Sequence, residues 1–230
     1  RRLETHGVQV IYGLPGEENL AVVEALAESS IALVVTRHEQ HAAFMAATHG
    51  RLTGQPGVCL ATLGPGATNL LTGLAHAELG GMPLIALTGQ KARTANDEGS
   101  FQVLDITAMA QPVTRWSTSI DDHRNIVSTI DEAFAQSMTA RPGAVLVELP
   151  EDVADERFEA IFPPVPLQPA SVSSPEDLEA TALRINAAKR PILLASSGAN
   201  AAAESLALTD FAEQTGIGVL ATQLGKGAID

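Results

Sequence analysis

Short, continuously apolar runs alternate along the chain with longer segments in which apolar residues recur at helical spacing. The runs predict buried strands, and the longer segments predict amphipathic helices. Because the strands are apolar throughout rather than alternating, we expect an α/β fold, a parallel sheet flanked by helices on both faces. The predicted strands are Val8–Tyr12, Ile31–Val35, Val58–Thr62, Leu84–Thr88 and Ala144–Leu149. The predicted helices are Glu17–Glu28, Glu39–Leu52, Ala67–Leu79, Asp105–Gln111 and Asp122–Thr139.

A proline-rich stretch, "FPPVPLQPASVSSP" at residues 162–175, divides the chain. It predicts a linker over residues 153–175, between a first domain at 1–152 and a second at 176–230. Two strands make a poor sheet on their own, so the second α/β domain is predicted to be incomplete. The chain also begins in what reads as the last turn of a helix, and we expect it to be a piece of a longer protein. The elements predicted after the linker are Pro175–Ala188, Ile192–Ala195, Ala202–Thr215 and Ile217–Ala221.

Composition narrows the classes of partner. The net charge of −13 disfavours nucleic acid and anionic membranes as partners. No apolar run approaches the ~20 residues of a membrane span, and no signal peptide is visible. Cys59 is the only cysteine and lies in an apolar run, so it is predicted to be a core residue. These features favour a reducing, cytoplasmic setting.

One polar stretch breaks the pattern inside the first domain. Residues 89–104 read "GQKARTANDEGSFQVL". A loop of this length in a compact domain is usually functional or disordered. We expect it to be mobile or poorly packed.

Polar and turn-forming residues gather where three predicted strands end. Glu39 follows one strand closely, and ligands of open parallel sheets bind at this carboxyl edge. A catalytic carboxylate is one interpretation, and a charge favoured by the helix dipole is the commoner one. The turns "GLPGEEN" at residues 13–19 and "GPG" at 64–66 each predict no more than the start of a helix when taken alone. His38 and His41 lie near Glu39, but the HExxH pattern is absent and no metal site is predicted.

Taken together, these turns are far more specific. In this order the chain contains "YGLPG", "TRHEQHAAFMA", "LATLGPGATNLLTGLAHA", "PLIALTGQ", "FQVLDI" and "QPVTRW". This succession resembles the thiamine-diphosphate enzymes of the acetolactate synthase and pyruvate oxidase family, and most closely the acetolactate synthase catalytic subunit. The resemblance covers residues 1–152 and continues in "KRPILLASSGA" and "ATQLGKGAID", which look like the start of the family's middle domain.

The resemblance implies a role for each matching position. Glu39 matches the glutamate that hydrogen-bonds N1′ of the cofactor's aminopyrimidine and so promotes loss of the thiazolium C2 proton. Pro65 and Asn69 match residues lining that ring. The turn Leu14, Pro15 and Gly16 matches the one that closes over it, although tyrosine is common where this chain has Leu14. Phe101 and Gln102 match a pair near the substrate, but Val103 stands where the family usually has glutamate, which leaves the substrate open.

The resemblance also implies what lies elsewhere. The family binds the diphosphate and Mg²⁺ through a Gly-Asp-Gly motif in a C-terminal domain, and these 230 residues contain no such motif. Active sites form between subunits, so a homodimer or tetramer is implied, and the isolated chain is expected to be inactive. FAD and a regulatory subunit are left open.

The implied reaction is decarboxylation of a 2-keto acid such as pyruvate, followed by ligation of the two-carbon unit to a second 2-keto acid. Sibling enzymes, a pyruvate oxidase or a 2-keto acid decarboxylase, remain alternatives. A non-catalytic α/β binding module is a further one, because a fold alone does not guarantee function.

Overall fold

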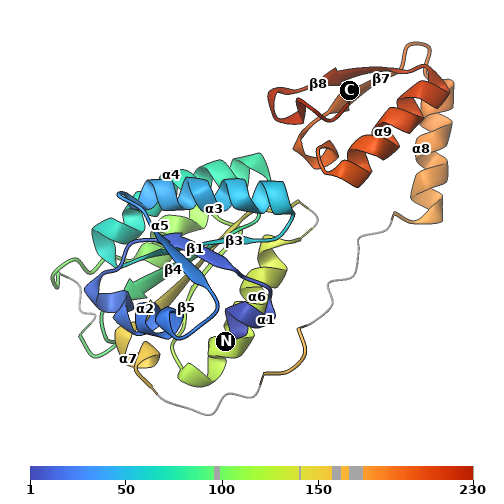
Figure 1. Cartoon of the computed structure of the whole chain (residues 1–230). Helices are drawn as coiled ribbons and strands as arrows, with labels where there is room; N and C mark the ends of the chain where they lie inside the picture. The colour runs from blue at the N-terminus through green and yellow to red at the C-terminus, as the bar shows by residue number, and fades with distance from the viewer. Residues whose placement is uncertain (96–98, 140, 157–161, 166–172, 230) are drawn as a thin grey trace. The chain divides into compact units, whose positions relative to one another are not determined.

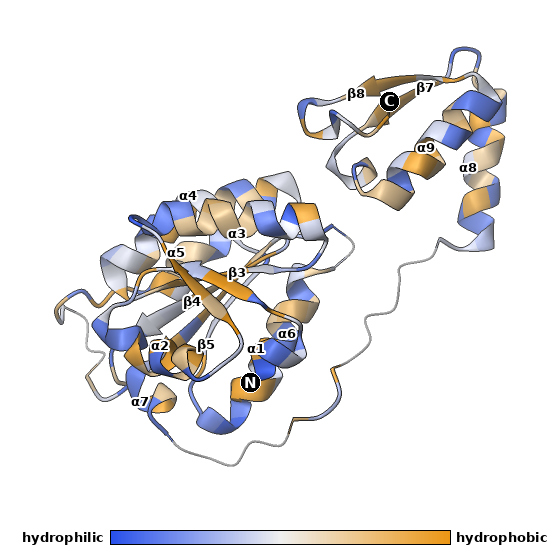
Figure 2. Cartoon of the chain, in the orientation of Figure 1, coloured by the Kyte–Doolittle hydropathy of each residue, from blue (hydrophilic) through white to orange (hydrophobic). Residues whose placement is uncertain are grey.

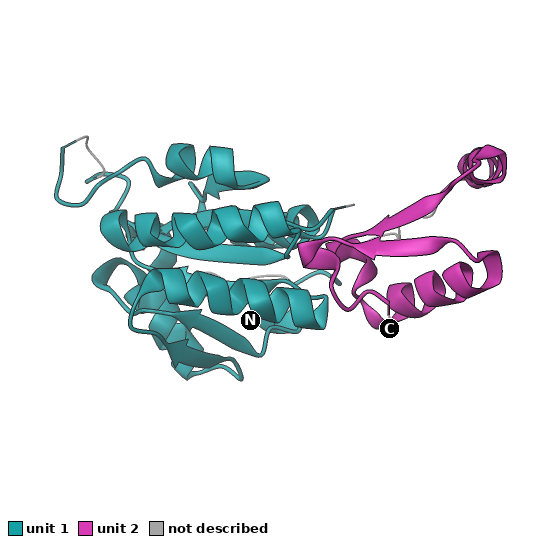
Figure 3. Ribbon diagram, turned by 90° about the horizontal axis from the view of Figure 1, so that it is seen from above, with its two compact units in different colours: residues 1–167 teal, residues 168–230 magenta. Residues whose placement is uncertain are grey.

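The computed structural model describes residues 1–95, 99–139, 141–156, 162–165 and 173–229. The chain divides into two compact units, residues 1–167 and 168–230 (Figure 3). Unit 1 contains a six-stranded sheet in the order β2-β1-β3-β4-β6-β5, and all of its neighbouring strands are parallel (Figure 1). This confirms the predicted α/β fold. The strands are β1 (Val10–Gly13), β2 (Ala32–Val35), β3 (Gly57–Ala61), β4 (Leu84–Gln90), β5 (Trp116–Ser119) and β6 (Ala144–Pro150).

Helices cover both faces of this sheet because its central strands are apolar on both sides. In β3, Cys59 and Ala61 pack with the helices of one face, while Val58 and Leu60 pack with those of the other. The first face carries α3 (Glu39–Thr53), α4 (Gly64–Gly80) and α5 (Ile106–Ala110). The second carries α2 (Leu20–Ala27), α6 (Ile126–Ser137) and α7 (Glu151–Ala154). The short segments of the unit are α1 (Arg2–Thr5), η1 (Glu17–Asn19), η2 (Gln111–Val113) and η3 (His123–Asn125).

Small residues let α3 and α4 approach each other and the sheet very closely. A Cβ added at Gly73 of α4 would lie 2.3 Å from the Cβ of Ala43 in α3. A Cβ at Gly57 of β3 would lie 1.9 Å from the carbonyl oxygen of Ala46. These contacts set how closely α3 packs against α4 and against the sheet.

The strand β5 was not predicted. Its sequence, Trp116-Ser117-Thr118-Ser119, carries a single apolar residue, so the search for apolar runs passed over it. As the edge strand of the sheet, β5 pairs on one side only, with β6, and such a strand needs less apolar sequence. The strand is therefore fixed by pairing rather than by its own hydrophobic pattern.

Two predicted boundaries were wrong because the residue types at them suggested a loop or a turn rather than a strand or a helix. The strand predicted to end at Thr88 continues through Gly89 and Gln90, which are buried in the sheet although their residue types suggested a loop. The helix predicted from Ala67 begins at Gly64, with Pro65 in its first turn, where proline is well tolerated.

The first residues of the polar stretch 89–104 pack against the rest of unit 1. The Nζ atom of Lys91 lies 2.7 Å from Oε1 of Glu18. The Arg93 side chain donates a 2.8 Å hydrogen bond to Asp152. The expectation of poor packing is therefore wrong for this part, while residues 96–98 lie outside the described part of the chain. Within the linker, residues 157–161 and 166–172 also lie outside it.

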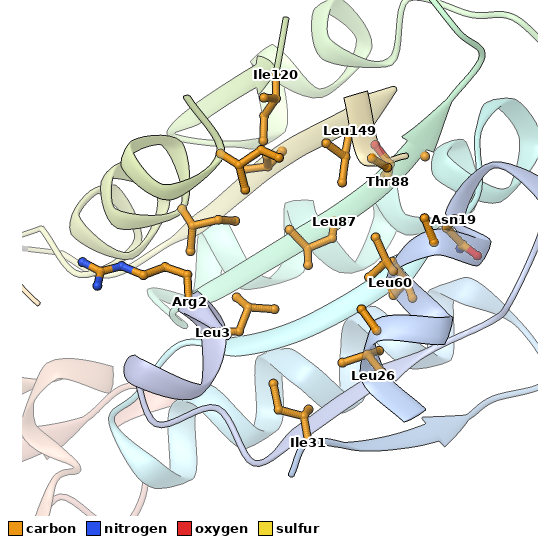
Figure 4. Close-up of a pocket in the computed structure, with 18 of the residues that line it drawn as sticks. Arg2, Leu3, Asn19, Leu26, Ile31, Leu60, Leu87, Thr88, Ile120 and Leu149 are labelled. Carbon is orange, nitrogen blue, oxygen red and sulfur yellow. The ribbon is translucent and has the colours of Figure 1, made fainter. Parts of the chain in front are cut away.

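Cys59 is a buried free cysteine, as predicted, and burial raises the pKa of its thiol to about 12. A largely apolar cavity of about 240 Å³ lies between the sheet and helices α2 and α6, with Leu60 and Leu87 among its lining residues (Figure 4). None of the helices in the described ranges has both the length and the apolar character needed to cross a membrane.

Unit 2 has a two-stranded parallel sheet of β7 (Ile192–Ala195) and β8 (Gly218–Ala221). Its strands are strongly apolar (Figure 2), yet Ile192 is 61% and Leu194 70% exposed. The described residues of this unit thus leave apolar surface uncovered. Its other elements are α8 (Pro175–Ala187), η4 (Ser197–Ala199), α9 (Ala202–Thr215) and η5 (Gln223–Gly225).

Candidate functional site

The strand ends of unit 1 converge on one edge of the sheet because all strands run parallel. Glu39 is the first residue of α3 and is separated from the end of β2 by the short turn at residues 36–38. The preceding residue, His38, caps this helix, with its Nδ1 accepting a 3.1 Å hydrogen bond from the backbone N–H of Gln40. A carboxylate in the first helical turn is also favoured by the helix dipole.

Glu39 and Asn69 meet across the site, as predicted. The Nδ2 atom of Asn69, in α4, donates a 2.9 Å hydrogen bond to Oε2 of Glu39. The other carboxylate oxygen, Oε1, lies beside Gly66, where an added Cβ would be 3.4 Å away. Within the described ranges no basic side chain forms an ion pair with Glu39. The half-buried carboxylate is therefore held by an amide and a close backbone, and it keeps its capacity to bind a further polar group.

The turn Leu14, Pro15 and Gly16 follows β1 and is braced by a buried amide. Asn19, 1% exposed, donates from Nδ2 to the Leu14 carbonyl at 3.1 Å. Its Oδ1 accepts from the Gly16 N–H at 2.9 Å. Pro15 is exposed at the tip, as is Pro65 in the first turn of α4. The proline side chains of both turns are therefore exposed and free to contact a ligand or a partner.

Glu18, Thr62 and Lys91, which we call the Glu18 network, connect three strand ends. Oε2 of Glu18 accepts a 2.6 Å hydrogen bond from the Thr62 hydroxyl, and Oε1 pairs with the Lys91 ammonium at 2.7 Å. Burial raises the pKa of Glu18, but hydrogen bonds from Lys91 and Thr62 outweigh it, and the net pKa lies below its ordinary value. Glu18 is therefore a buried, charged carboxylate.

The structure places Gln102 at the site and leaves Phe101 largely exposed. The Gln102 carbonyl lies against Gly64, where an added Cβ would approach it to 2.2 Å. Gln102 has a φ of 60°, which is rare outside glycine and is found preferentially at functional positions. The Phe101 ring is 79% exposed, so little of it packs on the described chain.

A second buried carboxylate lies where the polar stretch rejoins the sheet. The Gln90 amide donates to Glu148 at 2.9 Å and to the Leu104 carbonyl at 3.2 Å. Burial raises the pKa of Glu148, and the nearby Asp105 raises it further, against hydrogen bonds from Ser119 and Gln90 that lower it. These residues line a cavity of about 570 Å³.

Sequence reasoning did not single out the Glu18 network or the Gln90–Glu148 pair. The available signal was positional, since Thr62, Lys91 and Glu148 all stand at strand carboxyl ends, and these ends meet in a parallel sheet. Their pairing depends on side-chain direction, which spacing along the chain does not reveal.

The donor set suits an aminopyrimidine better than a metal. Glu39 offers a carboxylate to a ring nitrogen, and the flanking turns contribute backbone and proline surfaces. In the part of the chain that the structure describes, no three or more His, Cys, Asp or Glu residues are grouped so that they could hold a metal ion.

Comparison with known families gives this site its class. Residues 1–109 match the family described as thiamine pyrophosphate enzyme, N-terminal TPP binding domain, and residues 178–230 match thiamine pyrophosphate enzyme, central domain. The chain belongs to the thiamine pyrophosphate enzymes, as its succession of motifs predicted.

Among the similar proteins are acetolactate synthases from distant organisms. The acetolactate synthase of Arthrospira platensis is 37% identical over 99% of this chain and 41% of its own length. The probable acetolactate synthase large subunit of Methanocaldococcus jannaschii is 37% identical over 99% of this chain and 40% of its own length. The acetolactate synthase large subunit of Corynebacterium glutamicum is 36% identical over 99% of this chain and 37% of its own length. The chain thus spans about two fifths of the relatives that it matches.

Proposed function

We propose that the chain is the pyrimidine-binding part of an acetolactate synthase-like enzyme that uses thiamine diphosphate. Such an enzyme decarboxylates pyruvate or a related 2-keto acid and ligates the two-carbon unit to a second 2-keto acid. The observation that carries the proposal is the Glu39 carboxylate, held by Asn69 at the sheet edge where two further turns converge. The acetolactate synthase relatives, similar over 99% of the chain, support the choice of reaction.

Each candidate residue has a role in this proposal. Glu39 hydrogen-bonds N1′ of the pyrimidine and holds or releases a proton there, a general acid–base role that works best when water is excluded. Asn69 orients the carboxylate, and Pro65 lines the ring. Leu14, Pro15 and Gly16 close over its other side.

Phe101 and Gln102 lie on the substrate side in this proposal. When bound, thiamine diphosphate supplies a nucleophilic carbon for the 2-keto acid carbonyl, and the protein supplies orientation and electrostatics. The exposed Phe101 ring then becomes covered by cofactor, substrate or a partner subunit.

Further parts of the proposal concern the assembled protein. The diphosphate and Mg²⁺ are bound outside these 230 residues, by a domain of another subunit, so that the functional unit is at least a homodimer. A regulatory subunit fits relatives that are named as large subunits. FAD in the middle domain is part of the proposal only through the family resemblance. A cytoplasmic location fits the single, buried cysteine.

The test is product analysis with the full-length protein, thiamine diphosphate and Mg²⁺. From two molecules of pyruvate we expect one of acetolactate and one of CO₂, with the acetolactate detected as acetoin after acid treatment. Release of acetaldehyde, or of acetate or acetyl phosphate with consumption of O₂, would instead assign the chain to a sibling decarboxylase or oxidase. Cofactor binding without turnover of any 2-keto acid would favour a non-catalytic module.

A further inference from the structure

A partly buried hydrogen bond lies close to the proposed catalytic carboxylate, across from the same glycine, Gly66. Thr62 follows β3, and its hydroxyl donates to Glu18 at 2.6 Å. The methyl group of Thr62 faces Gly66, where an added Cβ would lie 2.9 Å from Cγ2. The same added Cβ would lie 3.4 Å from Oε1 of Glu39. The Thr62 methyl group and the Glu39 carboxylate thus both border the space beside the Cα atom of Gly66.

The same threonine also supports the turn after β1. A Cβ added at Gly16 would lie 2.6 Å from Cβ of Thr62. A β-branched side chain has few allowed χ1 rotamers, and its hydrogen bond to Glu18 selects one of them. The rotamer of Thr62 therefore decides which of its γ atoms, Oγ1 or Cγ2, faces Gly66 and Gly16.

We propose that Glu18 is a positioning residue, which fixes Thr62 and through it the placement of the first turn of α4 against the Glu39 carboxylate. The inference rests on the proposed role of Glu39. Glu18 suits this task because it is 7% exposed and its second oxygen is anchored by Lys91 at 2.7 Å. Lys91 directly follows β4 and begins the segment that leads to Phe101 and Gln102. The Glu18 network therefore also connects the start of this segment to the pyrimidine side of the site.

The variants Glu18→Gln and Thr62→Val test this directly in the full-length protein. The measurement is exchange of the thiazolium C2 proton of bound thiamine diphosphate for deuterium. Either variant should slow exchange about tenfold to a hundredfold, the size of effect expected from a small misplacement of a reacting group. Thr62→Ser keeps the hydroxyl and its hydrogen bond to Glu18 but lacks the methyl group that faces Gly66, so its rate should lie between those of Thr62→Val and the parent, and cofactor affinity should change little.

Matched controls separate positioning from a general loss of charge or of hydroxyl. Glu17→Gln removes an exposed carboxylate from the same turn, and Thr53→Val removes a hydroxyl that bonds within α3. Both should exchange at the parent rate. Thr62→Val leaves the Glu18–Lys91 ion pair in place, so it provides a folded test even where Glu18→Gln does not fold.

A double variant tests whether the effect passes through Glu39. In a Glu39→Gln background, adding Glu18→Gln should change the exchange rate less than twofold, because residues acting as one unit are not additive. An equal slowing in both backgrounds would overturn the inference, as would parent-like exchange in a folded Thr62→Val variant. If Glu39→Gln alone exchanged at the parent rate, the proposed function of Glu39 would fail instead, so the two failures are distinguishable.

Discussion

At the scale of single residues, the site combines carboxylates with different environments. Glu39 is half-buried and hydrogen-bonded to an amide, Glu18 is buried and paired with a cation, and Glu148 is buried and bonded to an amide. The cation beside Glu18 holds that carboxylate in its charged form. This difference fits the proposed roles, which are proton transfer for Glu39 and positioning for Glu18.

The environment of Glu148 predicts a pH-dependent stability. Because its folded-state pKa is raised above the ordinary value of 4.5, its ionisation opposes folding. The stabilising contribution is complete below pH 4.5 and is lost as the pH rises through the raised folded-state pKa. Glu148→Gln should therefore increase the free energy of unfolding at neutral pH by on the order of 1 kcal/mol. Near pH 4.5 the substitution should have little effect on the free energy of unfolding.

Urea unfolding of the 230-residue chain across this pH range measures the effect. Glu24→Gln, at an exposed position of α2, is the matched control and should behave like the parent. A Glu148→Gln variant that was less stable at neutral pH than at acidic pH, relative to the parent, would contradict the prediction.

Candidate site residues could be named from the sequence only where a resemblance supplied them. Glu39 and Asn69 were predicted together from the motif order, and the 2.9 Å hydrogen bond between them agrees with that pairing. Thr62 and Glu18 are 44 residues apart in the sequence, and their contact depends on which way each side chain points. No local pattern encodes that direction.

At the scale of elements, apolar runs predicted all strands except β5. The central strands are buried on both faces, so their sequences are apolar without interruption. β5 is partly exposed at the sheet edge and is polar at three of its four positions. Helix starts were harder to predict because Gly64 and Pro65 suggest a turn as readily as a first helical turn.

The close approach of α3 and α4 predicts a strong effect of a small substitution. Gly73→Ala would bring a Cβ within 2.3 Å of the Ala43 Cβ, so the two helices must separate. We expect a destabilisation of about 1–3 kcal/mol, as for other overpacked cores. The adjacent Thr72→Ala is exposed on the same helix and should stay within about 0.5 kcal/mol of the parent. Urea unfolding of both variants, followed by circular dichroism, makes the comparison, and equal midpoints would show that the helices are not in tight contact.

At the scale of the whole molecule, the proposed function makes this chain one part of a larger catalytic assembly. It spans about two fifths of its acetolactate synthase relatives, and unit 2 leaves apolar strand residues such as Leu194 exposed. The two-part organisation was suggested by the proline-rich stretch, because proline-rich segments seldom continue regular structure.

The central claim is that Glu39 activates the cofactor, and it is tested most directly in the full-length protein with bound thiamine diphosphate. The measurement compares deuterium exchange at the thiazolium C2 position in the parent, in Glu39→Gln and in the exposed control Glu28→Gln. We expect Glu39→Gln to fold and bind cofactor but to exchange about a hundredfold or more slowly, because an amide cannot transfer the proton that a carboxyl does. Exchange at the parent rate in a folded, cofactor-bound Glu39→Gln protein would contradict the account.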